Sequence, residues 1–407
     1  MLRGFRRVLA YWRAEQRTIR QGFVALVISS LGSLVAGVAL GSITGTLEVL
    51  PGLMVMVPAA IGMRGNIFGA LGSRLGTSIH AGMYEPTRRR EGVLYQNVYA
   101  VTVLTLAISM LEGVLAKTMT VAFGVRSISL VDFVVIAILG AVLSSLVVGA
   151  FTVGLSRGAY RKGWDLDSVA GPLITAAGDM VTVPALFLAT FLVRIPVVTP
   201  SVAGVLVLVA LVVTVRGLRT DLQGTRRILR ESLPILALAG GVDVFAGLVV
   251  EARLERFLVL PALLVLIPPY LEGEGALGAI LSARLASKLH LGVVSARLRP
   301  EALAWLDASI VLLFSIVNSV LTGVAAHFAA RLIGLASPGL VDMIGITVLA
   351  GLIATIPVIV VAYYTAVATY RIGLDPDNHG IPMITSSMDF VGVVSLVVAL
   401  LAYGIGS

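Results

Sequence analysis

The sequence of 407 residues contains no cysteine and only four histidines, and charged residues make up only 13% of it. The absence of cysteine excludes disulfide bonds and thiolate metal sites. The histidines lack the paired spacing that zinc sites use, and no serine lies in a nucleophile elbow. These absences argue against a membrane-embedded enzyme, and we predict that the chain is not one.

Apolar sequence is what the chain has in abundance. Hydrophobic residues account for 58% of it, and the mean hydropathy is +1.00. A single aqueous core cannot enclose that much apolar surface, so the composition is typical of a protein whose partner is membrane lipid. Many apolar runs approach the length of about 20 residues that a helix needs to cross the bilayer. We predict an all-α integral membrane protein with eleven transmembrane helices, at residues 22–47, 51–82, 98–123, 131–155, 168–193, 197–215, 233–250, 258–290, 303–330, 340–366 and 380–404.

The net charge of +8 could indicate nucleic-acid binding or membrane topology. The basic residues fall in short loops between apolar runs rather than on a polar and aromatic surface, so we predict no nucleic-acid partner. With a cytoplasmic N-terminus, most of them lie in cytoplasmic loops, which predicts a multi-pass protein of the plasma membrane with its C-terminus outside. The outer loops carry five arginines, Arg126, Arg194, Arg253, Arg256 and Arg331. This topology depends on the sixth span, which Pro196 and Pro200 shorten.

An internal repeat appears when the sequence is compared with itself at an offset of 210 residues. The matched pairs include Gly37 and Gly247, Pro51 and Pro261, Pro58 and Pro268, Gly65 and Gly275, Arg74 and Arg284, His80 and His290, Asp132 and Asp342, Thr175 and Thr385, and Asp179 and Asp389. We therefore predict a cytoplasmic basic segment (1–21), a first five-helix repeat (22–194), a linker helix with its loop (195–231) and a second five-helix repeat (232–407). Because the linker adds one crossing, the repeats should be parallel. One chain then imitates a dimer, while further association of chains stays open.

Two carboxylates lie where an apolar helix should have none. Asp179 and Asp389 are expected near mid-depth in the fifth helix of each repeat, where an Asp costs roughly 2.5–3.5 kcal/mol. Thr175 and Thr385 precede them by one helical turn on the same face. One interpretation is that the two acids converge and attract a hard cation such as Mg²⁺, which retains several waters and contacts few carboxylates. The alternative is that each Asp is a structural hydrogen-bond anchor between helices.

The second helix of each repeat is too long for one straight crossing. Residues 51–80 would extend about 45 Å as a single helix, so we expect it to tilt or break. Pro58, Gly62 and Gly65 predict the position of a break, which would turn backbone carbonyls and the Asn66 oxygen toward a cavity. A proline kink packed against neighbouring helices is the alternative.

Four further acids lie within spans and differ between the copies, namely Glu112, Asp243, Glu272 and Glu274. They could bind a coupling ion or a second Mg²⁺, although Glu112 could instead pair with Lys117. Arg74 and Arg284 could snorkel to the interface or form a latch with acids that precede the fifth helices, namely Asp165, Asp167, Asp375 and Asp377.

The strings "GNIFGALGSRLGTSIHAG" and "GPLITAAGDM" resemble the MgtE magnesium transporters and, more closely, the duplicated solute carrier family 41. The resemblance covers roughly residues 20 to 404. It implies two five-helix MgtE-like units with Mg²⁺ transport through their interface. By motif position it also implies that Asp179 and Asp389 are the pore aspartates and that Gly65 and Asn66 form a pore turn, although Gly275 and Ala276 depart from this pattern in the second copy.

Two mechanisms are compatible with these residues. In the first, partly hydrated Mg²⁺, or another divalent cation, passes the aspartates in a channel. In the second, the protein is an exchanger that couples Mg²⁺ to Na⁺ or H⁺ through the four additional acids. No other cofactor is expected.

Overall fold

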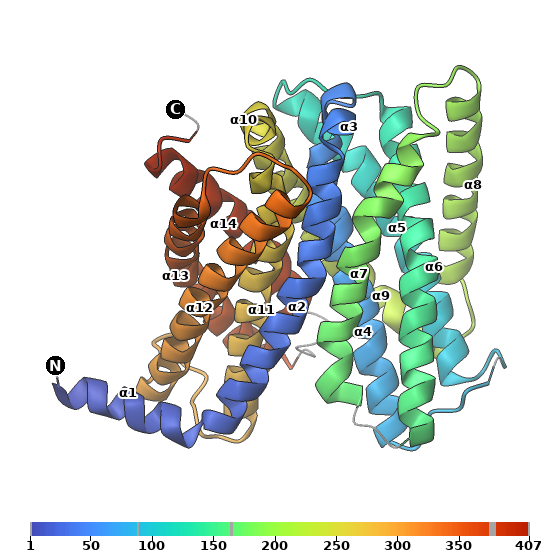
Figure 1. Cartoon of the computed structure of the whole chain (residues 1–407). Helices are drawn as coiled ribbons and strands as arrows, with labels where there is room; N and C mark the ends of the chain where they lie inside the picture. Colours follow the sequence, from blue (N-terminus) through green and yellow to red (C-terminus); the bar gives the residue numbers. More distant parts are fainter. Residues whose placement is uncertain (1, 88, 163–165, 374–379, 406–407) are drawn as a thin grey trace. The chain divides into compact units, whose positions relative to one another are not determined.

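The computed structural model describes residues 2–87, 89–162, 166–373 and 380–405, which contain helices and no strand (Figure 1). Eleven helical stretches of this described chain are long and apolar enough to cross a membrane, which confirms the predicted number. They comprise α2 (Gln16–Ser42), η1 with α4 (Leu53–Val55 and Val57–His80), α5 (Val93–Ala122), α6 (Leu130–Lys162), α7 (Leu166–Thr190), α8 (Val198–Leu218), α9 (Gln223–Glu251), α11 (Ala262–His290), α12 (Ala302–Leu332), α13 (Leu340–Ile372) and α14 (Ile381–Ala402). Three shorter helices, α1 (Leu2–Ala14), α3 (Thr44–Val49) and α10 (Leu254–Val259), were not predicted.

The sixth span, on which the predicted topology depends, is a regular helix. α8 begins at Val198, so Pro200 lies in its first turn, where a missing backbone N–H costs nothing. Ala210 packs against Leu106 and Ile138 of α5 and α6. Most of its other side chains point outward, as expected for a span that faces lipid.

The chain forms two compact units that do not follow the repeats in simple order. Unit 1 contains residues 1–37 and 259–407, and unit 2 contains residues 38–258. Each unit therefore combines helices two to five of one repeat with most of the first helix of the other repeat. The core of unit 1 includes Leu26 of α2 with Leu277 and Phe314, and that of unit 2 includes Leu236 of α9.

Glycines at equivalent positions allow the exchanged helices to approach closely. A Cβ on Gly37 of α2 would lie 2.0 Å from the carbonyl oxygen of Val265, and a Cβ on Gly247 of α9 would lie 2.2 Å from that of Val55. Both members of each pair lie within one unit, and both pairs are related by the offset of 210 residues. The repeat in the sequence is thus also a repeat of backbone contacts.

Replacement of Gly247 by Ala is expected to destabilise the protein strongly. The new methyl group would overlap backbone atoms, which cannot rotate away, and overpacking of this kind typically costs about 1–3 kcal/mol. The matched control is Gly241→Ala in the same helix, because no atom lies within 4 Å of its Cβ position. Thermal unfolding in detergent should show a lower midpoint for Gly247→Ala and an unchanged or higher one for Gly241→Ala. Equal midpoints would contradict the close approach.

The long second helix of repeat 1 is broken, but not where the sequence predicted. The interruption lies at Gly52–Met56, and α4 then runs without a break from Val57 through Gly62, Gly65 and Asn66 to His80. Pro58 is in the first turn of α4, a position that starts a helix rather than breaking one. The prediction of a break through Gly62 and Gly65, and of a Gly-Asn pore turn, was therefore wrong. A glycine in the sequence does not by itself predict a break or a pore turn, because Gly65 lies inside α4 and contacts Thr175 of α7.

The interruption in repeat 1 has a local cause that repeat 2 lacks. Gly52 has a φ of +86°, which favours glycine, and its N–H donates to the carboxylate of Glu251 at 2.7 Å. Met54 N–H donates to the same carboxylate at 3.1 Å. The residue equivalent to Gly52 in repeat 2 is Ala262, where α11 begins and continues through Pro268 and Pro269 to His290. The second copy is therefore one long helix.

Candidate functional site

Asp179 lies near the middle of α7, where this helix crosses α4 in unit 2. Gly65 of α4 meets the methyl group of Thr175, with 3.6 Å between a Cβ position on Gly65 and Thr175 Cγ2. One turn further on, a Cβ position on Gly178 lies 3.5 Å from Arg64 Cβ. The small residues bring the helices together, and the side chain of Asp179 is only 1% exposed. The crossing thus holds a carboxylate in the buried interior of unit 2.

Unit 1 contains the equivalent crossing between α11 and α14. A Cβ position on Gly275 lies 3.6 Å from Thr385 Cγ2, the same value as in unit 2. The Thr385 hydroxyl donates to carbonyl oxygens of its own helix, those of Ile381 and Pro382, both at 3.1 Å. Thr385 therefore packs through its methyl group, and Asp389 follows one turn later. The two predicted Thr–Asp pairs occupy matching places.

Arg64 and Glu112 are two buried side chains of opposite charge in unit 2, and Arg64 Cβ lies beside Gly178, the residue before Asp179. Arg64 is 1% and Glu112 is 3% exposed, and the two side chains interact electrostatically. Arg64 Nη1 donates to the carbonyl oxygen of Ala141 at 3.3 Å and to the hydroxyl of Ser145. Arg64 Nε and Nη2 and Glu112 Oε1 have no hydrogen-bond partner in the structure. Charged groups that are buried and only partly satisfied are expensive, so we expect them to have a role beyond packing.

The structure rejects the alternative partner of Glu112. Lys117 donates to the hydroxyl of Ser127 at 3.0 Å and to the carbonyl oxygen of Ile128 at 2.9 Å, and so ties α5 to the following loop. A separation of five residues places Glu112 and Lys117 on different faces of a helix, whereas favourable pairs are three or four apart.

Asp243 reaches unit 2 on α9, the first helix of the other repeat. Its side chain is fully buried. One turn earlier, a Cβ position on Gly240 lies 3.7 Å from Glu112 Oε1 and 3.9 Å from Met63 Sδ. Glycine therefore lets α9 come close to Glu112, and the carboxylate-bearing turns of α5 and α9 are neighbours. Asn66, on α4, is 7% exposed.

Two further acids of repeat 2, Glu272 and Glu274, lie on α11 in unit 1. Glu272 accepts a hydrogen bond from Ser29 of α2, and Ser30 donates to Asn318 of α12 at 3.0 Å. Glu274 is 1% exposed, and its Cγ lies 3.9 Å from a Cβ position on Gly392, one turn beyond Asp389. Glu274 thus lies against the helix of Asp389, at the position that Arg64 occupies in repeat 1.

Arg74 and Arg284 have partners that sequence reasoning missed. Arg74 Nε donates to Asn97 Oδ1 at 2.9 Å, and Arg284 Nε donates to Asp307 Oδ1 at 3.0 Å. Asn97 and Asp307 are 210 residues apart, and this polar pair at the start of two apolar spans was the available signal. The predicted latch involves Asp165, Asp375 and Asp377, which lie outside the described residues, and Asp167, whose side chain is not described.

Within the described ranges, no three His, Cys, Asp or Glu side chains lie close enough together to hold a metal ion. The described His, Asp and Glu side chains therefore do not form a site in which the protein alone supplies every ligand of a metal ion. Mg²⁺ is commonly held by one or two carboxylates and retained waters. One acid at each crossing is compatible with that mode of binding a transported cation.

Two similar helical crossings, one with the buried Asp179 and one with the partly buried Asp389, lie among membrane-spanning helices and define a duplicated membrane transport protein. The profile of the MgtE family, described as a divalent cation transporter, matches residues 57–189 and 267–399. The two matches have equal length and the same offset as the repeat. The chain belongs to the MgtE family, which confirms the resemblance.

Individual relatives support the same conclusion. The chain is 26% identical over 412 residues to solute carrier family 41 member 3 of Rattus norvegicus, covering 94% of this chain and 87% of the relative. It is 27% identical to member 3 of Mus musculus, covering 84% and 73%, and 23% identical to member 2 of Gallus gallus, covering 93% and 69%. No solved structure matches the chain significantly.

Proposed function

We propose that the protein transports Mg²⁺ across the plasma membrane along a path to which Asp179 and Asp389 contribute one carboxylate each. The observation that carries this proposal is the buried Asp179 at a helix crossing whose glycine and threonine contacts recur at 3.6 Å beside Asp389. A carboxylate at this depth costs free energy unless a cation or a hydrogen-bond network balances it. The partly hydrated cation would be the balancing charge during transport.

The orientation that we propose has the N-terminus in the cytoplasm and the C-terminus outside. It rests on the eleven spans and on the arginines concentrated in the loops that this orientation places inside. Since one chain contains both repeats, we propose that a second chain is not needed to form the path.

A coupled exchanger is the second candidate function. The additional buried acids favour it, because Glu274 and Asp243 are buried and have no acidic equivalent in repeat 1, where Arg64 and Ser33 take their places. In that mechanism Na⁺ or H⁺ would bind these carboxylates in alternation with Mg²⁺.

Flux in liposomes tests both candidates. We expect the reconstituted chain to carry Mg²⁺ down its gradient, measured with an enclosed Mg²⁺-sensitive dye. An opposing Na⁺ or pH gradient should leave the rate unchanged for a channel, whereas an exchanger should accelerate Mg²⁺ movement against its own gradient. Protein-free liposomes are the control. Absence of Mg²⁺ flux under every gradient would overturn the proposal.

A further inference from the structure

The first helix of the chain has two faces of different character. Arg6, Arg7 and Arg13 of α1 are exposed, as are Arg17 and Arg20 at the start of α2. Val8, Tyr11 and Trp12 lie on the other side and are partly buried. A helix with one basic face and one face of Trp, Tyr and aliphatic side chains is typical of segments that lie in the membrane interface.

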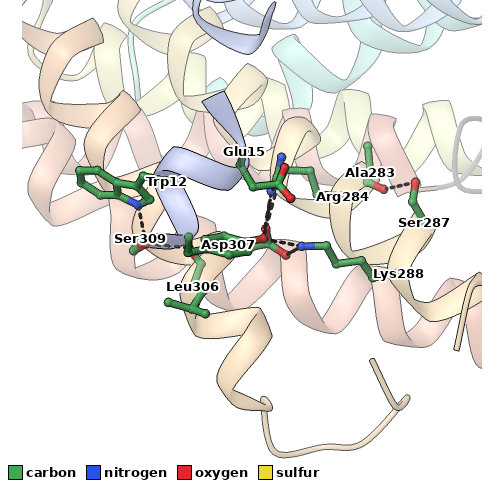
Figure 2. Close-up of polar contacts among 10 residues, drawn as sticks. Trp12, Glu15, Ala283, Arg284, Ser287, Lys288, Leu306, Asp307 and Ser309 are labelled. Atoms are coloured by element: carbon green, nitrogen blue, oxygen red, sulfur yellow. Dashed lines mark hydrogen bonds and ion pairs between the residues drawn. The ribbon is translucent and has the colours of Figure 1, made fainter. Parts of the chain in front are cut away.

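The inner face of α1 is fixed to unit 1 by specific contacts (Figure 2). Tyr11 donates to Asp307 Oδ1 at 2.7 Å, and Trp12 Nε1 donates to the hydroxyl of Ser309 at 3.0 Å. Asp307 is fully buried and also pairs with Arg284 at 2.7 Å and Lys288 at 2.6 Å. Burial and the hydrogen bond to Asp307 raise the pKa of Tyr11 well above its usual value, so its hydroxyl remains a donor.

The groups that hold α1 in unit 1 differ from those at the equivalent place in unit 2. At the equivalent place in unit 2, Arg74 is bonded to the neutral amide of Asn97. In unit 1 the carboxylate of Asp307 replaces that amide and attracts Lys288, which donates to the Tyr11 hydroxyl at 2.6 Å. Glu15, at the bend after α1, adds an ion pair with Arg284 at 3.2 Å. These contacts orient α1 and leave its arginines on the opposite side.

The position of α1 along the chain decides what those arginines meet. The first span begins at Ile19, only five residues after α1 ends. Figure 1 shows α1 lying across the end of α12, with which it is in contact, rather than continuing the direction of α2. The arginine face therefore lies close to the level of the lipid headgroups. Guanidinium groups bind phosphate by paired hydrogen bonds, and anionic lipids attract clusters of basic residues next to a span.

We propose that the exposed arginine face of α1 is a binding surface for the phosphate headgroups of anionic lipids, with the Asp307 cluster holding the helix in the required orientation. This surface is separate from the cation path, and the proposal does not depend on which ion the protein carries. Charge complementarity favours lipid over an apolar protein partner, because the exposed side chains in question are arginines and alanines.

Energy transfer from α1 to labelled lipids tests the proposal in the full chain. Because the sequence has no cysteine, Ala10→Cys places one donor dye between the exposed arginines. The protein is reconstituted in nanodiscs with a trace of acceptor dye on phosphatidylglycerol or on phosphatidylcholine. We expect enrichment of phosphatidylglycerol near the donor, by about fivefold for each arginine engaged. The enrichment should decrease at 1 M salt, where the Debye length falls to about 3 Å.

Variants with matched charge separate this surface from a general effect of net charge. Arg6→Gln with Arg13→Gln and Arg17→Gln should abolish the enrichment, while Lys at the same three positions should retain most of it. The control removes three exposed arginines elsewhere, at Arg226, Arg227 and Arg230, and should retain it. Three results would overturn the proposal. Energy transfer could be equal to both labelled lipids, the Gln variant could keep the enrichment, or the control variant could lose as much enrichment as the Gln variant.

Discussion

Asp179→Asn is expected to reduce Mg²⁺ uptake by at least about a hundredfold while the protein folds normally. Asn has nearly the shape of Asp but lacks the charge that attracts the cation. A unit charge pair about 4 Å apart is worth about 4 kcal/mol at an effective dielectric constant of 20, and about 2.7 kcal/mol already corresponds to a factor of a hundred. Thermal unfolding in detergent is measured beside uptake, so that a folding defect is distinguished from a transport defect. Uptake per folded molecule in liposomes is the measurement.

Asp132→Asn is the matched control for this experiment. Asp132 is also a buried aspartate that recurs in the second repeat, but it lies in the first turn of α6. Its carboxylate accepts from the hydroxyl of Ser129 at 2.7 Å, and Ser129 Oγ accepts from the Asp132 N–H at 3.1 Å. Together with the Ser129 N–H, which donates to the same carboxylate oxygen at 3.3 Å, these bonds form a capping box. The other carboxylate oxygen accepts from the Arg194 N–H at 3.2 Å, so Asn can keep the capping bonds and loses only that one. Normal uptake is expected for Asp132→Asn, and equal loss in both variants would contradict the assignment of Asp179.

Asp389→Asn should reduce uptake less than Asp179→Asn. Glu274 lies against α14 one turn from Asp389, so unit 1 retains a buried carboxylate close to the substituted position. Unit 2 instead has Arg64 at the position equivalent to Glu274, next to Asp179. The same measurement, with Asp389→Asn and the double variant of Asp389 and Glu274, should show that the second substitution deepens the loss. No further loss would separate Glu274 from the path.

The sequence predicts the eleven spans and the repeat because both depend on patterns that it carries directly. A helix needs about 20 apolar residues to cross the bilayer, so hydropathy alone locates the spans. The repeat is found by matching residues at an offset of 210, which requires no knowledge of their contacts. Asp179 follows Thr175 by one helical turn, so the sequence also predicts that the two residues share a face of their helix. These features needed no knowledge of which helix packs against which.

The exchange of first helices between the units was not predictable in the same way. Gly37 could pack against either copy, because Val55 and Val265 are both valines at equivalent positions, and only the backbone contacts decide. The docking of Tyr11 to Asp307 joins residues 296 positions apart, and no periodicity indicates such a contact. Glycine was also ambiguous, since Gly52 interrupts a helix and Gly65 lies within one.

A double-mutant cycle at Arg64 and Glu112 should show strong coupling. Arg64→Met leaves Glu112 buried without its opposite charge, and Glu112→Gln leaves Arg64 in the same state. Leaving one buried charge without its opposite costs free energy, up to about 3–5 kcal/mol where the two groups are in direct contact, whereas replacing both groups by uncharged ones is often nearly neutral. We therefore expect each single variant to unfold at a clearly lower temperature in detergent, and the double variant to recover most of the loss.

Repeat 2 provides the internal reason to expect this recovery. It has Glu274 and Thr322 at the positions of Arg64 and Glu112, so the fold of a unit does not require an arginine and a glutamate there. If the effects of the single variants simply add in the double variant, Arg64 and Glu112 do not act as a pair. Strong coupling in stability, combined with altered Mg²⁺ uptake in the recovered double variant, would instead show that the pair sets the charge beside Asp179. Because repeat 2 has Glu274 and Thr322 at these positions, the buried charges would then differ between the two repeats of the transporter.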